Sequence, residues 1–185
     1  MDSDSFASFY EFAKVTQAER VKRAILENYT EDQILGTVTL SHEGINGSLV
    51  GNEESMNRLI KSLIDEHGFR NLLVNRSKIT TSPFDRLVVR IKDEIVTSGF
   101  ENLVPSDSNY IEPENWDDFI RKDDVVTIDV RNFYEHSIGS FNNATCPKIR
   151  RFRQFPDFVR QNLIRRKNKK IAIFCTGGIR CEKAS

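Results

Sequence analysis

The residue best placed for chemistry in this sequence is Cys175, the first residue of the segment Cys175-Thr-Gly-Gly-Ile-Arg180. The apolar residues 170–175 predict a buried strand, and residues 181–185 are compatible with a helix. In a parallel α/β sheet, ligands gather at the carboxyl ends of the strands. Backbone N–H groups of a loop at that position, together with the start of the next helix, lower the pKa of a thiol. The spacing therefore predicts a reactive thiolate at Cys175.

The residues between Cys175 and Arg180 suit a tight anion-binding loop. Two glycines let the chain curl around the sulfur without Cβ atoms in the way. Arg180 adds a fixed positive charge, and we expect its guanidinium to hold the curl by bonding several backbone carbonyls. The predicted active-site loop contains Thr176, Gly177, Gly178, Ile179 and Arg180.

This loop resembles the active-site loop of rhodanese domains. The resemblance extends upstream to Asp129-Val-Arg131, followed by Glu135 and Ile138-Gly139. More narrowly, three segments resemble the rhodanese-containing tRNA uridine hydroxylases, the UPF0176-type family. They are Cys175-Thr-Gly-Gly-Ile-Arg-Cys-Glu-Lys-Ala-Ser185, Ser41-His-Glu-Gly-Ile-Asn-Gly47 and Lys92-Asp-Glu-Ile-Val96.

The resemblance implies a ferredoxin-like (acylphosphatase-like) domain joined to a rhodanese domain. The implied activity is oxygen-dependent hydroxylation of the wobble uridine of tRNA to 5-hydroxyuridine, with Cys175 as the catalytic cysteine. Molecular oxygen is then the co-substrate and tRNA the partner, while the sequence shows no motif for another cofactor and none for a protein partner. Members of this family continue beyond the loop, so the resemblance also predicts that a chain ending at Ser185 is truncated.

Other chemistries remain open on the residues alone. A sulfurtransferase carrying a persulfide on Cys175 uses the same loop. A phosphatase fits less well, because protein tyrosine phosphatases place five residues between Cys and Arg and this loop has four. A non-catalytic RNA-binding module is the alternative from a different class.

Several further residues could have either a chemical or a structural role. Asp129 and Arg131 are expected to form an internal ion pair that braces the site. Cys181 is either a resolving thiol for Cys175 or a packing residue, and Cys146 has no partner by spacing. The absence of a C-x-x-C pair argues against a zinc site. His42 and Glu43 are expected to form a turn, and His136 to be a solvated loop residue.

Charge is balanced over the whole chain but not along it. The sequence has 27 basic and 27 acidic residues, yet residues 101–124 carry a net charge of −6 and residues 148–170 a net charge of +9. Aromatic residues alternate with the basic ones in the second segment, a pattern typical of RNA contact. The predicted RNA-binding residues are Arg165, Arg166, Lys169 and Lys170.

The first half of the chain predicts a βαββαβ order, which is typical of a ferredoxin-like α+β sandwich. Thr16 and Glu19 have capping-box spacing before a first helix, and Asn52 is expected to cap a second. A turn is predicted at Gly44-Ile-Asn-Gly47. The expected strands are residues 6–15, 34–40, 48–50 and 71–75, with further extended segments at 87–91 and 94–97.

The second half predicts an α/β domain. Residues 125–130 and 170–175 read as buried parallel strands with a helix at 155–166 between them. The predicted organisation is therefore a ferredoxin-like domain at 1–97, a linker at 98–113, and the front part of a rhodanese domain at 114–185. With no apolar run of about 18 residues and three sparse cysteines, the sequence predicts no membrane span and a reducing cytoplasm.

Overall fold

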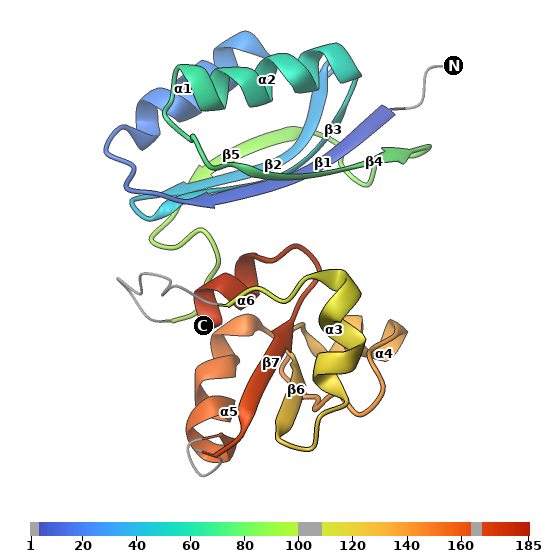
Figure 1. Ribbon diagram of the computed structural model, residues 1–185. Coiled ribbons are helices and arrows are strands. Elements are labelled where there is room, and N and C mark those ends of the chain that lie inside the picture. The colour runs from blue at the N-terminus through green and yellow to red at the C-terminus, as the bar shows by residue number, and fades with distance from the viewer. Residues whose placement is uncertain (1–3, 100–108, 164–167) are drawn as a thin grey trace. The chain divides into compact units, whose positions relative to one another are not determined.

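The computed structural model describes residues 4–99, 109–163 and 168–185. The chain divides into two compact units, Met1–Ile95 and Val96–Ser185 (Figure 1). The predicted linker at 98–113 falls largely on residues 100–108, outside the described residues. Within the described ranges, no helix combines the length and apolar character needed to cross a bilayer.

The first unit is a five-stranded sheet with two helices on one face (Figure 1). The strand order is β4-β1-β3-β2-β5, antiparallel except for the parallel pair β2 and β5. The predicted βαββαβ order is confirmed, but residues 94–97 form no strand. The elements are β1 (Asp4–Phe12), α1 (Ala18–Asn28), β2 (Ile34–Ser41), β3 (Gly44–Gly51), α2 (Glu53–Asp65), β4 (Leu73–Ile79) and β5 (Leu87–Ile91).

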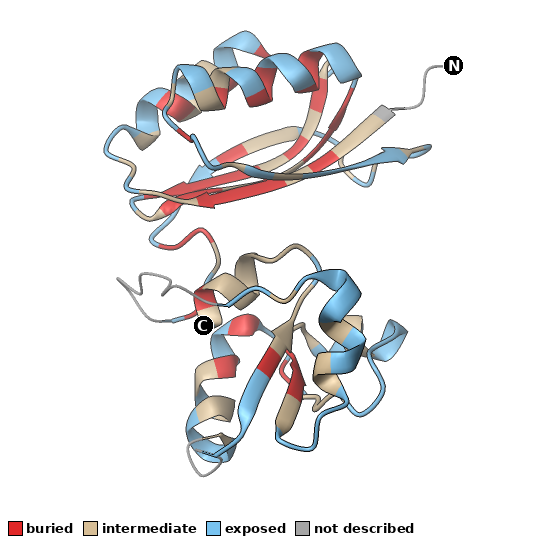
Figure 2. Cartoon of the chain, in the orientation of Figure 1, coloured by how far each residue is buried: buried red, intermediate tan, exposed pale blue. Residues whose placement is uncertain are grey.

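One core holds the helices of the first unit against its sheet (Figure 2). Helix α2 contributes an apolar stripe at helical spacing, in which Met56, Leu59 and Leu63 are fully buried. Asn52 caps this helix as predicted, because its side chain accepts the Ser55 N–H at 2.8 Å. Burial of the stripe, at about 25 cal/mol per Å² of apolar surface, gives α2 most of its stability.

Two local predictions for this unit are wrong by a small shift along the chain. Helix α1 begins one residue later than the capping box requires, with Gln17 at its N-cap and no side-chain cap bond. The β2–β3 turn lies at His42 and Glu43, and Gly44–Gly51 is the strand β3. The glycine at 47 serves close packing, because a Cβ there would lie 2.3 Å from the ring of Phe9.

We expect Gly47→Ala to destabilise the first unit by about 1–3 kcal/mol, because the buried Phe9 ring cannot move aside without losing its own packing. Hydrogen exchange of the β1 and β3 amides measures this. Ser48→Ala, on the opposite face of the same strand, is the control and should leave protection unchanged. Equal protection in Gly47→Ala and wild type would show that the Phe9 contact does not constrain this position.

The second unit contains a parallel pair of strands with helices around it (Figure 1). Ile128, Val130, Ile149, Phe152 and Phe155 form its buried core. The parallel pairing agrees with the predicted strand–helix–strand arrangement. The elements are α3 (Pro113–Ile120), β6 (Val125–Asp129), α4 (Phe133–Ile138), the short 3-10 helix η1 (Phe152–Gln154), α5 (Phe155–Asn162), β7 (Lys170–Phe174) and α6 (Ile179–Ala184).

Candidate active site

The carboxyl ends of β6 and β7 meet at one edge of the parallel pair. Asp129 and Phe174 are register partners, and the Val130 N–H donates to the Phe174 carbonyl at 3.1 Å. The segment after β6 and the Cys175 loop after β7 therefore start side by side. This is the edge at which α/β proteins gather functional side chains.

Cys175 lies in a loop that stabilises its thiolate. The Gly178 N–H donates to the Cys175 Sγ at 3.2 Å. Gly178 has a φ of 87°, in the left-handed region that favours glycine, just before α6 begins. The pKa of Cys175 is lowered to about 5, chiefly by a hydrogen bond from the Cys181 thiol. The backbone amides of Cys181 and Gly178 and the charge of Arg180 lower this pKa further, whereas burial of the sulfur raises it. Cys175 is consequently a thiolate at neutral pH.

Cys181 stays protonated beside Cys175. Its hydrogen bond to the Cys175 sulfur and its burial both raise the pKa of the Cys181 thiol. The backbone donor at Gly178 acts on Cys175, so the negative charge belongs on Cys175. Neither cysteine is in a disulfide. The structure thus places Cys181 as a hydrogen-bond donor to the candidate catalytic residue.

A carboxylate, rather than backbone carbonyls, accepts the hydrogen bonds of Arg180. The prediction that Arg180 bonds several backbone carbonyls is therefore wrong. Its two terminal nitrogens donate to the two Glu135 oxygens at 2.6 and 2.7 Å. Glu135 also accepts from the Thr176 hydroxyl at 2.9 Å. Burial raises the pKa of Glu135, but the Arg180 bonds outweigh it and the net shift is downward. A carboxylate on α4 therefore fixes both ends of the segment Thr176–Arg180.

The predicted ion pair of Asp129 and Arg131 is confirmed. Arg131 donates through Nε and a terminal nitrogen to the two Asp129 oxygens, each at 2.8 Å. The fully buried Asp129 also accepts from the Ser140 hydroxyl and from His136 Nδ1, both at 3.0 Å. His136 is therefore not a solvated loop residue as predicted, since its ring joins this buried cluster. Burial raises the pKa of Asp129, yet the bonds from Arg131 and its neighbours lower it to about 2.

The remaining candidates lie away from this cluster or outside the described residues. Arg165 and Arg166 belong to the residues that are not described. Lys169 donates to the Asp123 carbonyl, and Lys170 pairs with Asp124. Cys146 is partly buried and free. No group of three or more metal-ligating side chains occurs among the described residues.

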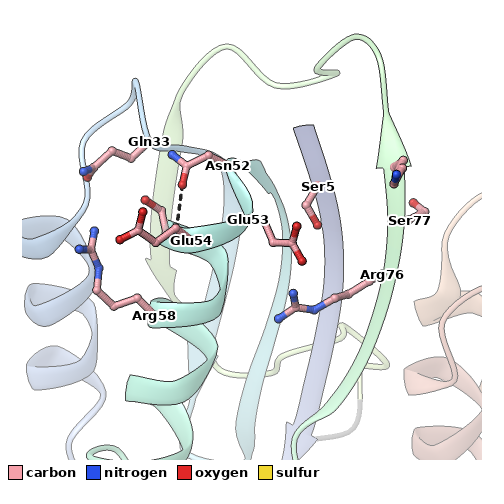
Figure 3. Close-up of a pocket in the computed structure, with 10 residues that line it drawn as sticks. Ser5, Gln33, Asn52, Glu53, Glu54, Arg58, Arg76 and Ser77 are labelled. Atoms are coloured by element: carbon pink, nitrogen blue, oxygen red, sulfur yellow. Dashed lines mark hydrogen bonds between the residues drawn. The ribbon is translucent and has the colours of Figure 1, made fainter. Parts of the chain in front are cut away.

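A separate polar cavity of about 860 Å³ lies in the first unit at the start of α2 (Figure 3). Glu53 and Arg76 project toward it from α2 and β4, with Glu54 and Arg58 on the other side of the helix start (Figure 3). Two acidic and three basic side chains line the cavity, so their charges nearly cancel. Among the described residues, the mutually bonded polar and reactive side chains gather around the Cys175 loop.

We expect Arg180→Lys to raise the apparent pKa of Cys175 by about one unit, because one ammonium cannot bond both Glu135 oxygens and the loop loses its shape. Alkylation rate against pH measures this. Arg121→Lys, at an exposed position on the same unit, is the control. An unchanged pH profile in Arg180→Lys would show that only the positive charge matters at position 180. A similar rise in the Cys175 pKa in Glu135→Gln would support the role of the Arg180–Glu135 pair in shaping the loop.

Together the fold and the site define a protein with a ferredoxin-like α+β unit and a second unit that carries a thiolate loop beside a parallel strand pair. The family described as the UPF0176 acylphosphatase like domain matches residues 5–95. A tRNA uridine(34) hydroxylase of Legionella pneumophila (strain Corby) is 44% identical over 181 residues, covering 97% of this chain and 71% of that protein.

A second relative comes from a different organism. The tRNA uridine(34) hydroxylase of Picosynechococcus sp. is 40% identical over 180 residues, covering 96% of this chain and 60% of that protein. A solved acylphosphatase from Coxiella burnetii aligns with 48% of this chain and 94% of its own at 20% identity, with a TM-score of 0.34. The chain belongs to the family of the tRNA uridine(34) hydroxylases.

Proposed function

We propose that this protein hydroxylates uridine 34 of tRNA, giving 5-hydroxyuridine, with Cys175 as the reactive residue. The substrate and reaction follow from the curated relatives, which are named tRNA uridine(34) hydroxylase and match nearly the whole chain. The observation that carries the assignment to this site is the low pKa of Cys175 in a loop closed by the Glu135–Arg180 pair. A thiolate at neutral pH is the nucleophile such a site supplies.

The oxygen atom of the new hydroxyl group is proposed to come from molecular oxygen, as the family resemblance implies. Replacing the hydrogen on C5 of uridine by a hydroxyl group is a two-electron oxidation. With molecular oxygen, one atom enters the base and the other leaves as water, which consumes two further electrons and two protons from a reductant. The reductant is a co-reactant of the reaction and is not assigned to any residue of this chain.

The second unit is proposed to be the front part of a rhodanese domain. The parallel strands β6 and β7, the four residues between Cys175 and Arg180, and the Asp129–Arg131 pair support this proposal. A persulfide on Cys175 would suit the same loop, but the names of the relatives favour hydroxylation over sulfur transfer. A tRNA substrate also favours a cytoplasmic location.

Nucleoside mass spectrometry of tRNA tests the proposed function. Cells that lack the protein should lose 5-hydroxyuridine and its derivatives, and the gene supplied in trans should restore them. An unchanged 5-hydroxyuridine content in the deletion strain, in the absence of a second enzyme for the same position, would refute the proposal.

A further inference from the structure

The basic segment Lys148–Lys170 divides into two parts in the structure. In its later part, two of the described cations pair with carboxylates and a third is held by a backbone carbonyl. Arg160 pairs with Asp157, the Lys169 ammonium donates to the Asp123 carbonyl at 2.6 Å, and Lys170 pairs with Asp124 at 3.1 Å. The charge of Lys170 is therefore offset by a carboxylate, while the Lys169 ammonium is held in place by a backbone carbonyl.

The earlier part of the segment keeps its charge. Four exposed cations lie here, and within the described ranges no carboxylate is at ion-pair distance from any of them. The backbone beneath them is fixed, because the Gln154 Oε1 accepts the N–H groups of Arg150 and Arg151 at 2.8 and 3.1 Å. We call this surface the basic ridge, and it contains Lys148, Arg150, Arg151 and Arg153.

The basic ridge adjoins helix α4, which also reaches the Cys175 loop. The Phe133 N–H, at the start of α4, donates to the Ile149 carbonyl at 2.7 Å, and Ile149 is buried between two ridge residues in sequence. Glu135 on the same helix bonds Thr176 and Arg180. Phe133 and Glu135 are two positions apart in the first turn of α4, so a helix rise of about 3 Å separates the contact to the ridge backbone from the contact to the Cys175 loop.

Two aromatic rings are exposed at the start of α4, at the two positions before Glu135. Phe133 and Tyr134 are 46% and 64% exposed, so two adjacent aromatic side chains on α4 are accessible to a partner. Arg and Lys side chains bind phosphates, and exposed rings stack on unpaired bases. A duplex offers no free base face, whereas a single-stranded loop offers both phosphates and bases.

We propose that the basic ridge binds the phosphates of a single-stranded RNA loop while Phe133 and Tyr134 stack on its unpaired bases, next to Cys175. The identity of that RNA, the anticodon loop that carries uridine 34, rests on the proposed function. The ridge replaces Lys169 and Lys170 as the main RNA contact of this segment. Phosphate contacts set the register of the loop, and stacking on α4 holds a base beside the thiolate.

A pair of charge-matched variants tests the ridge. The ridge variant is Arg150→Gln/Arg151→Gln/Arg153→Gln, and the control is Arg160→Gln/Lys169→Gln/Lys170→Gln from the same segment. Binding of a labelled anticodon stem-loop is measured by fluorescence anisotropy over a range of salt concentrations, after circular dichroism has verified folding. Each lost phosphate contact lowers the log–log salt slope by about 0.7, so the ridge variant should lose about 2 from its slope and the control almost nothing.

The stacking component has its own test. Tyr134→Ala should weaken binding of the stem-loop about tenfold while leaving binding of a blunt RNA duplex unchanged, and Tyr134→Phe should bind like wild type. Leu73→Ala, at an exposed apolar residue of the first unit, is the control. Equal losses for the loop and the duplex would overturn the stacking role.

The outcomes separate this inference from the proposed function, because RNA binding is measured without turnover. A ridge variant that binds and modifies tRNA like wild type overturns the ridge and leaves the hydroxylase assignment intact. A control variant that loses as much slope as the ridge variant also overturns it, as does wild-type protein that binds no stem-loop. A ridge variant with the expected loss, in a protein that forms no 5-hydroxyuridine, supports the ridge and refutes the function.

Discussion

Alkylation of Cys175 by iodoacetamide is expected to show a midpoint near pH 5, far below the value of about 8.5 for a free thiol. The cause is the group of donors around the sulfur, led by the Cys181 thiol and supported by the amides of Gly178 and Cys181 and the charge of Arg180. Alkylation rates are measured on the wild-type protein by mass spectrometry of the Cys175 peptide, because Cys181 must stay in place. At neutral pH nearly all Cys175 should then react as thiolate.

Two cysteine variants separate the causes of that low midpoint. Cys181→Ala removes the largest stabilising contact and should raise the midpoint by at least one pH unit, which corresponds to about 1.4 kcal/mol. Cys146→Ala removes a thiol outside the cluster and should leave it unchanged. A wild-type midpoint at or above about pH 8.5 would contradict the low pKa of Cys175.

Replacing Asp129 by alanine is expected to destabilise the second unit by about 3–5 kcal/mol. The substitution leaves Arg131 without its carboxylate and removes the acceptor of His136 and Ser140 in a buried cluster. Urea unfolding followed by the fluorescence of Trp116, the single tryptophan of the chain, reports on this unit. Asp117→Ala breaks an exposed pair with Arg121 and is the control, with an expected change below about 1 kcal/mol.

Asp129 also gives the second unit a defined acid sensitivity. The folded pKa of about 2 lies below the ordinary value of 3.8. Its contribution to stability, about 2 kcal/mol, is therefore fully present above pH 4 and is lost as the pH falls from about 4 to 2. The Asp129→Ala variant should lack this loss over the same range. A wild-type unfolding free energy that is flat from pH 4 to 2 would contradict the assignment.

The first unit could be predicted from its sequence because hydrophobic periodicity and one cap define its elements. Met56, Leu59 and Leu63 all face the core as their spacing indicates. The turn predicted at residues 44–47 was wrong because glycine is common both in turns and at close-packed positions in strands. Only the position of the Phe9 ring, set by pairing between β1 and β3, shows which role Gly47 has.

The candidate site could be predicted where its residues are neighbours in the chain. Cys175, Gly178 and Cys181 lie within one loop and its helix, and Asp129 lies two residues from Arg131. The partner of Arg180 could not be found this way, because Glu135 is 45 positions away and meets the loop only through the parallel pairing of β6 and β7. The only indication in the sequence that Glu135 belongs to the site was its position in the segment that resembles rhodanese.

The RNA surface shows a similar limit. A count of charges along residues 148–170 does not reveal which cations have partners, because Asp123 and Asp124 approach Lys169 and Lys170 from another part of the chain. The structure separates the bonded cations Lys169 and Lys170 from the four on the basic ridge. Side-chain pairing between distant segments, rather than local composition, decides where charge is available.

The measurement that tests the central claim most directly is the 5-hydroxyuridine content of tRNA from cells in which Cys175→Ser replaces the wild-type protein, with Cys146→Ser as the matched control. Serine at position 175 keeps the size of the side chain but supplies no thiolate at neutral pH. The account predicts that Cys175→Ser protein binds the anticodon stem-loop like wild type and forms no 5-hydroxyuridine, while Cys146→Ser restores the full yield. Full 5-hydroxyuridine content with Cys175→Ser would contradict the assignment of Cys175 as the reactive residue.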